Sequence, residues 1–140
     1  MLSRSCTLIV RYAETDAQGV AHHANYLTWF EEGRSEFLRQ LGMNYSDFER
    51  AGFFVVVAHA DVDYRAPAFY EDRVTVMVTL EKARSRVLEF AYRVVNQDDL
   101  LLAAGRTVHV VTGRDRRPSS LPQEWLSRFR QGEEQRDFPG

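Results

Sequence analysis

Residues 11–26 read RYAETDAQGVAHHANY, and this stretch leads from an apolar strand pattern through a glycine-containing loop into a long helix pattern. One carboxylate, Asp16, lies in the loop a few residues before the expected helix. A helix N-terminus has unpaired backbone N–H groups and a partial positive charge. A carboxylate beside such donors can attack a carbonyl carbon while the donors hold the oxyanion that forms. The stretch therefore predicts a strand–loop–helix unit and a candidate site for acyl chemistry.

The flanking residues extend this unit in both directions. Residues 5–12 alternate between apolar and polar side chains, which predicts a strand. One face of this strand would hold Cys6, Leu8, Val10 and Tyr12. Apolar residues at helical spacing predict a helix over residues 23–41, closed by Gly42. A capping-box pattern at residues 46–49 predicts a second, short helix that begins at Ser46 and ends near residue 52.

The rest of the chain is mostly strand pattern. Four further strands are expected over residues 53–65, 73–83, 87–96 and 100–112, and a last short helix from Pro122. Short links between consecutive strands predict an antiparallel meander. The simplest packing lays the long helix across one face of a curved sheet. We expect the other face to carry apolar residues as well and to be covered by a partner subunit.

Composition is ordinary for a globular protein, with 140 residues, 44% hydrophobic and 27% charged. We expect a single domain over residues 1–131 and a polar tail over residues 132–140. A net charge of −2 argues against a general nucleic-acid binder. The single cysteine rules out an intrachain disulfide, and there is neither zinc-ligand spacing nor an apolar run that could span a membrane. We therefore expect a cytoplasmic protein without a bound metal.

The loop and helix together resemble the hotdog-fold acyl-CoA thioesterases, in particular the 4-hydroxybenzoyl-CoA thioesterase group and the Tol-Pal-associated thioesterases within it. The resemblance rests on the motif at residues 11–26, on Glu31 and Arg34 in the helix, and on Asp-Tyr-Arg-Ala-Pro at residues 63–67, followed by Asp72. It implies an α+β hotdog fold, in which a curved five- to six-stranded antiparallel sheet wraps around a long central helix. It also implies an acyl-CoA substrate, no cofactor, and homodimers or homotetramers with active sites at the dimer interface.

The resemblance assigns catalytic roles to residues of the loop. Asp16 either attacks the thioester carbonyl as a nucleophile or activates a water as a general base, and the sequence leaves both routes open. The backbone N–H of His23, at the helix start, aligns with the group that polarises the carbonyl, and the His23 ring is a candidate for orienting substrate or water. Tyr12 is expected at the mouth of the loop, where its hydroxyl is a candidate for a hydrogen bond near Asp16; a half-buried aromatic residue of the strand is the alternative and the slightly favoured interpretation. Without the resemblance, a turn or cap role would be the commoner interpretation of Asp16.

Candidate substrate contacts follow from the same resemblance. Gly19 supplies either an unusual backbone conformation or room for the thioester. Tyr26 is a candidate contact for the acyl group, with core packing as the alternative. The turn between two strands is a candidate site for the coenzyme A phosphates, with a solvated charged turn as the alternative; its residues are Arg84, Ser85 and Arg86. Glu31 is the reserve catalytic carboxylate, because some hotdog thioesterases place theirs on the helix.

Two other functions remain open. One is a hotdog dehydratase or hydratase acting on acyl thioesters, although its histidine-and-acid motif is not found here. The other is an acyl-CoA-binding protein without turnover, against which the presence of Asp16 and Gly19 argues. The acyl specificity, and the choice between coenzyme A and an acyl carrier protein, do not follow from the sequence.

Overall fold

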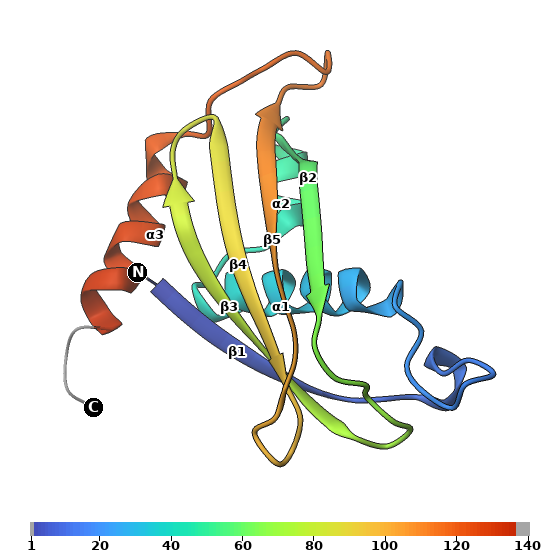
Figure 1. Ribbon diagram of the computed structural model, residues 1–140. Helices are drawn as coiled ribbons and strands as arrows, with labels where there is room; N and C mark the ends of the chain where they lie inside the picture. Colours follow the sequence, from blue (N-terminus) through green and yellow to red (C-terminus); the bar gives the residue numbers. More distant parts are fainter. Residues whose placement is uncertain (1, 137–140) are drawn as a thin grey trace.

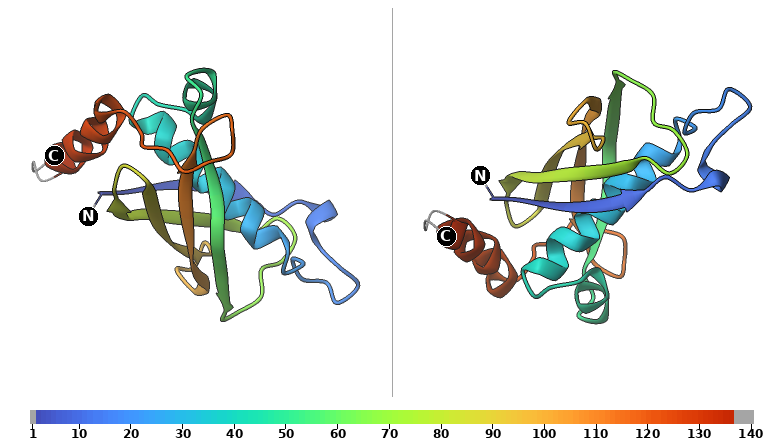
Figure 2. Two further views of the ribbon diagram at one scale, coloured as in Figure 1. Left: turned by 90° about the horizontal axis from the view of Figure 1, so that it is seen from above. Right: turned by 90° about the horizontal axis from the view of Figure 1, so that it is seen from below.

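The computed structural model describes residues 2–136, with side chains through residue 130, and shows a curved sheet around one long helix (Figure 1). The five strands are β1 (Leu2–Ile9), β2 (Phe54–Tyr64), β3 (Arg73–Ala83), β4 (Val87–Val95) and β5 (Leu101–Thr112). The helices are α1 (Asn25–Gln40), α2 (Tyr45–Arg50) and α3 (Gln123–Arg136), and a 3-10 turn, η1 (Tyr12–Glu14), follows β1. Views from above and below show α1 lying across one face of the sheet (Figure 2). The α+β hotdog fold predicted from the sequence is confirmed.

The strand order differs from the expected meander at one strand. The order is β1-β3-β4-β5-β2, so β3, β4 and β5 follow one another as predicted. β2 pairs with β5 from Phe54↔Thr112 to Tyr64↔Ala103, with a shift of register between Val57 and His59, and not with β3. The prediction of a meander through β2 is wrong because both edges of β3 are occupied, one by β1 and the other by β4. β2 is consequently an edge strand of the sheet.

The first strand has the predicted length of eight residues but begins and ends three residues earlier than predicted. β1 ends at Ile9, and Cys6, Leu8 and Val10 face the core or its margin as expected. Tyr12 does not continue this face, because the backbone turns into η1 immediately after Arg11. The turn is closed by the Glu14 carboxylate, which accepts the Arg11 backbone N–H at 2.8 Å. The placement of Tyr12 in a strand is therefore wrong.

The long helix begins two residues later than predicted and ends at Gln40, one residue before the predicted end. Gly42 has a φ of +75°, the left-handed conformation that glycine adopts without strain. The Met43 N–H donates to the Leu38 carbonyl at 2.9 Å, and the Gly42 N–H donates to the Arg39 carbonyl at 3.0 Å, so α1 ends in a Schellman motif. The cap of α2 is Asn44, whose side chain accepts the Asp47 N–H, and not Ser46 as the capping-box pattern predicted.

The core lies between α1 and the concave face of the sheet. A Cβ atom on Gly33 would lie only 2.7 Å from a methyl group of Val78 and 2.9 Å from one of Val76. Glycine at this position therefore lets the helix backbone lie close to β3. Phe30 stacks on Tyr92 of β4 with ring centroids 4.1 Å apart, which fixes the helix against the middle of the sheet.

The outer face of the sheet carries both polar and apolar side chains. Val76 and Val78 point into the core, so the alternating residues Thr75 and Thr79 point outward. On the same face, Glu89 is paired with Lys82 at 3.1 Å and with Arg106 at 2.7 Å. Met77, between the two threonines, is an exposed apolar residue of this face, and the covering of the face by a partner subunit stays a prediction. Further exposed apolar side chains lie on the edge strand β2, at Val56 and Val57.

The C-terminal helix packs at the end of the sheet. Trp125 of α3 packs edge to face on Phe48 of α2, with ring centroids 4.6 Å apart. Since α3 runs to Arg136, the expected domain boundary at residue 131 falls within this helix. Residues 137–140 of the expected tail lie outside the described residues. The division into a domain over residues 1–131 and a tail over residues 132–140 stays a prediction.

Candidate active site

The loop between β1 and α1 is held by the buried carboxylate of Glu14. Its Oε1 accepts the Arg11 backbone N–H at 2.8 Å, and its Oε2 accepts the indole N–H of Trp29 at 2.8 Å. Its backbone carbonyl accepts the His22 N–H at 2.8 Å. Burial by itself raises the pKa of Glu14, but these side-chain hydrogen bonds and the Arg11 guanidinium hold that pKa below its usual value. Glu14 is therefore ionised at neutral pH and ties the loop to α1.

Asp16 lies at the start of a tight turn in this loop. Its carbonyl accepts the Gly19 N–H at 2.9 Å, and its own N–H donates to the Val20 carbonyl at 3.0 Å. Gly19 has a φ of +81°, and a Cβ atom there would meet nothing within 4 Å. The turn thus uses the backbone freedom of glycine, the first of its two expected roles. The half-buried Asp16 carboxylate accepts the Gln18 N–H at 2.9 Å through Oδ1, and within residues 2–136 no hydrogen bond occupies Oδ2.

In the described structure, the start of α1 leaves the His23 backbone N–H free. The Ala24 N–H donates to Nδ1 of His22 at 3.2 Å, and the Asn25 N–H donates to the His22 carbonyl at 3.0 Å. The His23 N–H finds no acceptor in the described part of the chain. The His23 carbonyl accepts the Tyr64 hydroxyl at 2.9 Å, which joins the helix start to the end of β2. The donor expected at His23 is therefore available to an external oxygen.

Asp16 and His23 line one cavity of about 290 Å³. Tyr26 of α1 and Tyr64 of β2 line the same cavity and pack edge to face, with ring centroids 5.1 Å apart. Burial raises the pKa of both phenols, so both hydroxyls are protonated at neutral pH. The structure thus brings Asp16, His23 and Tyr26 together, and Gly19 shapes the turn beside them.

Tyr12 lies outside this cavity. Its side chain is 75% exposed and packs edge to face on Tyr70, with ring centroids 5.6 Å apart. Within the described residues no hydrogen bond joins its hydroxyl to Asp16. The expected contact is absent because the 3-10 turn fixed by Glu14 directs the chain away from the line of β1.

The basic turn is also remote from Asp16 within one chain. Arg73, at the start of β3, pairs with Ile9 near the loop, whereas the turn follows Ala83 at the other end of the strand (Figure 1). At about 3.3 Å per residue the strand separates the two ends by roughly 35 Å. Side chains of this turn also make local contacts, such as Arg86 Nε donating to Ser120 Oγ at 3.2 Å. Within a single chain, the basic turn therefore does not reach the cavity. The residues of this turn are Arg84, Ser85 and Arg86.

Three residues that shape the site were not predicted from the sequence to have a role in it. Glu14 and Tyr64 make the anchoring contacts described above, and the Asn25 amide donates to the Glu14 carbonyl at 2.7 Å. All three lie within the motif segments at residues 11–26 and 63–67, which was the signal available in the sequence. Their partners are distant along the chain, so their roles could be assigned only from the structure.

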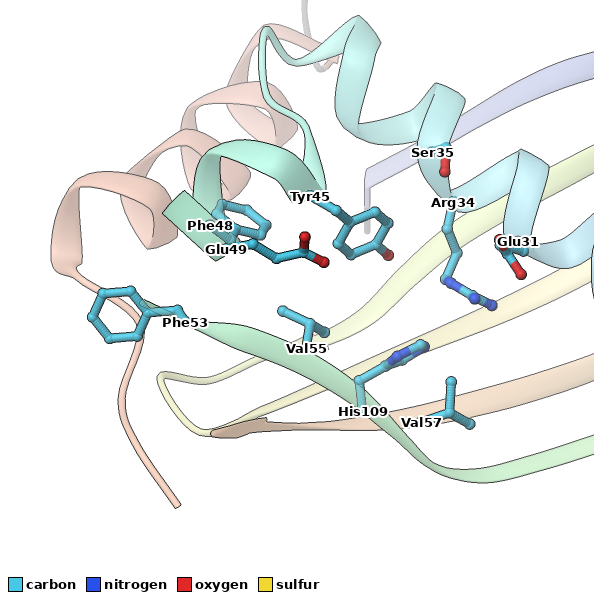
Figure 3. A pocket seen from close by; sticks show the side chains of 10 residues that line it. All are labelled: Glu31, Arg34, Ser35, Tyr45, Phe48, Glu49, Phe53, Val55, Val57 and His109. Carbon is cyan, nitrogen blue, oxygen red and sulfur yellow. The ribbon is translucent and has the colours of Figure 1, made fainter. Parts of the chain in front are cut away.

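Glu31 lies away from this site. It lines a different cavity, together with Arg34 and His109 (Figure 3). In the part of the chain that the structure describes, no three acidic, histidine or cysteine side chains are placed to hold a metal ion. None of the helices described there combines the length and the apolarity needed to cross a membrane.

Comparison with known proteins agrees with this architecture. Residues 10–129 match the thioesterase-like superfamily. The chain is 33% identical to the acyl-CoA thioester hydrolase YbgC of Escherichia coli O157:H7, over 87% of this chain and 92% of the relative. It superposes on a DHNA-CoA thioesterase from Staphylococcus aureus with a TM-score of 0.90, at 29% identity, over 98% of this chain and 95% of the other. A solved Aquifex aeolicus protein gives a TM-score of 0.81 at 36% identity, over 89% and 97% of the two chains.

Proposed function

The chain belongs to the thioesterase-like superfamily, and we propose that it is a hydrolase that converts an acyl-CoA thioester and water into a free acid and coenzyme A. The observation that carries this proposal is the meeting of Asp16 and a free His23 N–H in one cavity. The names of the Escherichia coli and Staphylococcus aureus relatives, both acyl-CoA hydrolases, support the same reaction.

We assign the chemical step to Asp16. In one route a carboxylate oxygen attacks the thioester carbonyl carbon, the C–S bond breaks, coenzyme A leaves as its thiolate, and water then hydrolyses the anhydride. In the other route the carboxylate takes a proton from a water that attacks the carbonyl directly. In both, the carbonyl oxygen gains negative charge, which the His23 N–H at the start of α1 would stabilise. Gly19 and Tyr64 act here as positioning residues for the loop and the helix start.

We further propose that a partner subunit completes the site. The edge strand β2 leaves one side without a strand partner in the described chain and exposes Val56 and Val57, features that favour pairing with a second copy. The basic turn after β3 could reach coenzyme A bound at Asp16 only from such a partner, in which case Arg84 and Arg86 would meet its phosphates. We expect sedimentation to show a homodimer or homotetramer. A stable, fully active monomer would contradict the shared site.

The proposal is tested by measuring free thiol released from a panel of acyl-CoA substrates. We expect Asp16→Ala and Asp16→Asn to lose about 100-fold or more of kcat, as expected for loss of a nucleophile or general base. Asp98→Asn, in the exposed turn after β4, is the matched control and should behave as wild type. Full activity in both Asp16 variants would remove Asp16 from the mechanism.

The same panel separates the alternative functions. Hydration of enoyl-CoA substrates without thiol release would indicate a hydratase. Binding of an acyl-CoA analogue without turnover of any substrate would indicate a binding protein.

A further inference from the structure

A second cavity of about 280 Å³ lies between α1, α2 and the strands β2 and β5 (Figure 3). None of the residues that line it also line the Asp16 cavity. Its polar side chains include Arg34 and His109, which reach toward one another from α1 and β5 in Figure 3. Both are almost fully buried, with 7% of Arg34 and 1% of His109 exposed.

Among the side chains that the structure describes, Arg34 is a buried cation without a counter-anion. Its Nη1 donates to the Tyr92 hydroxyl at 3.0 Å, and the Tyr45 hydroxyl also interacts with the guanidinium. Within the described residues, no Asp or Glu lies within ion-pair distance of it, and its Nε has no acceptor. A buried charge without a partner is costly, and so is a buried donor without an acceptor. The side chain is therefore well suited to receive an anionic oxygen.

A chain of hydroxyl groups extends this donor set to His109. Arg34 donates to Tyr92, whose hydroxyl contacts the Thr107 hydroxyl, and Thr107 lies 2.8 Å from Nε2 of His109. Both hydroxyl hydrogens are used when Tyr92 donates to Thr107 and Thr107 donates to Nε2, and this assignment leaves the His109 proton on Nδ1. Burial lowers the pKa of His109 to about 3, so the ring is neutral. Nδ1 is also without a partner in the described structure, and is thus a second unpaired donor.

The other walls of the cavity are mostly apolar. Phe48, Phe53, Val55 and Val57 surround the polar end. Glu31 and Glu49 also line the cavity, but both are exposed, so water screens their charges more than it screens the buried guanidinium. The cavity is therefore lined by two buried polar side chains, one of them cationic, together with a hydrocarbon surface.

We propose that this cavity binds a carboxylate carried on an apolar body, with the carboxylate on Arg34 and His109. Such a group has two sources, a free carboxylic acid or the distal carboxylate of an acyl thioester. The binding site itself does not depend on the proposed catalysis; only the second source does.

The binding test titrates sodium octanoate, and 1-octanol as its uncharged match, into wild-type protein and Asp16→Asn, by calorimetry. Charge-assisted hydrogen bonds of this kind correspond to roughly tenfold or more in affinity. We expect octanoate to bind at least about tenfold more tightly than octanol, and equally well to both proteins. Equal affinity for octanol, or loss of octanoate binding in Asp16→Asn, would overturn the proposal. Because Asp16→Asn is used for binding alone, this result is independent of whether the protein hydrolyses thioesters.

Two variants locate the ligand. Arg34→Gln removes the cation and should weaken octanoate binding about tenfold or more. Since that buried substitution can impair folding, Ser35→Trp fills the cavity from its partly buried rim while retaining Arg34. Folded Ser35→Trp should bind no octanoate. Unchanged octanoate affinity in folded Ser35→Trp would overturn the proposal.

The two sources are distinguished by kinetics with octanoyl-CoA and 7-carboxyheptanoyl-CoA. A KM about tenfold lower for the carboxylated substrate, lost in Ser35→Trp, would identify the distal carboxylate of the substrate as the ligand. Equal KM values, together with octanoate inhibition that does not compete with octanoyl-CoA and is lost in Ser35→Trp, would identify the free acid.

Discussion

The buried Glu14 carboxylate offers the sharpest test of how the loop is held. In Glu14→Gln, the side chain has the same shape, but one of its two oxygens becomes an NH₂ group. The two carboxylate oxygens accept N–H groups from Arg11 and Trp29, each at 2.8 Å. The amide can accept only one of them and turns a donor toward the other. An unsatisfied buried N–H costs about 1–3 kcal/mol, so we expect a loss of about 2 kcal/mol in the free energy of unfolding.

Urea denaturation at pH 7 measures this loss. At about 2–4 °C per kcal/mol for a chain of this size, the melting temperature should also fall by roughly 4–8 °C. Glu36→Gln is the matched control, because Glu36 is paired with Arg39 at 2.9 Å near the surface of α1. Glu36→Gln should lose less than about 1 kcal/mol in the free energy of unfolding.

The stability difference between wild type and Glu14→Gln is expected to depend on pH. The folded-state pKa of Glu14 is lowered, so its stabilising contribution is complete above the ordinary carboxyl pKa near 4.5. This stabilising contribution is lost as the pH falls from the ordinary carboxyl pKa to the lowered pKa of Glu14 in the folded protein. The stability gap between wild type and Glu14→Gln should therefore be constant from pH 7 to about pH 5 and shrink toward pH 3. A gap no larger than that of Glu36→Gln, or one that persists unchanged at pH 3, would refute the role assigned to Glu14.

Two further substitutions test how the site and the sheet are built. Tyr64→Phe removes the hydroxyl that donates to the His23 carbonyl at 2.9 Å; we expect kcat/KM for thiol release to fall roughly three- to tenfold, with the urea midpoint little changed because the side chain is half exposed. Gly105→Ala would place a Cβ atom in steric clash with the Asp61 carbonyl oxygen, so we expect a loss of about 2 kcal/mol or more in the free energy of unfolding, measured by urea denaturation. Wild-type stability in Gly105→Ala would show that β5 and β2 can separate freely at this point.

The local elements of this fold follow closely from the sequence. Strands β3 and β5 and the end of α1 agree with their predicted bounds to within one residue. The motif at residues 11–26 also predicted the loop that holds Asp16 before the helix. These features depend on alternation, helical spacing and a left-handed glycine, all of which act between residues near one another in the chain.

Other features of the site could not be obtained in this way. Tyr12 belongs to the strand pattern but leaves the strand, because Glu14 and Trp29 form a hydrogen bond between residues 15 positions apart. The helix start is fixed by Tyr64, 41 positions after His23. Neither partner can be identified from spacing.

The amino-acid sequence alone thus determined which segments become helix and strand, and that an acidic loop precedes the long helix, because short-range backbone preferences decide these. Only the tertiary structure decided that β2 pairs with β5, that the basic turn lies a strand's length from Asp16, and that Arg34 and His109 meet in a cavity of their own. The physical reason is that burial and hydrogen bonding select these partners among residues far apart in the chain, and their selection depends on all elements packing at once.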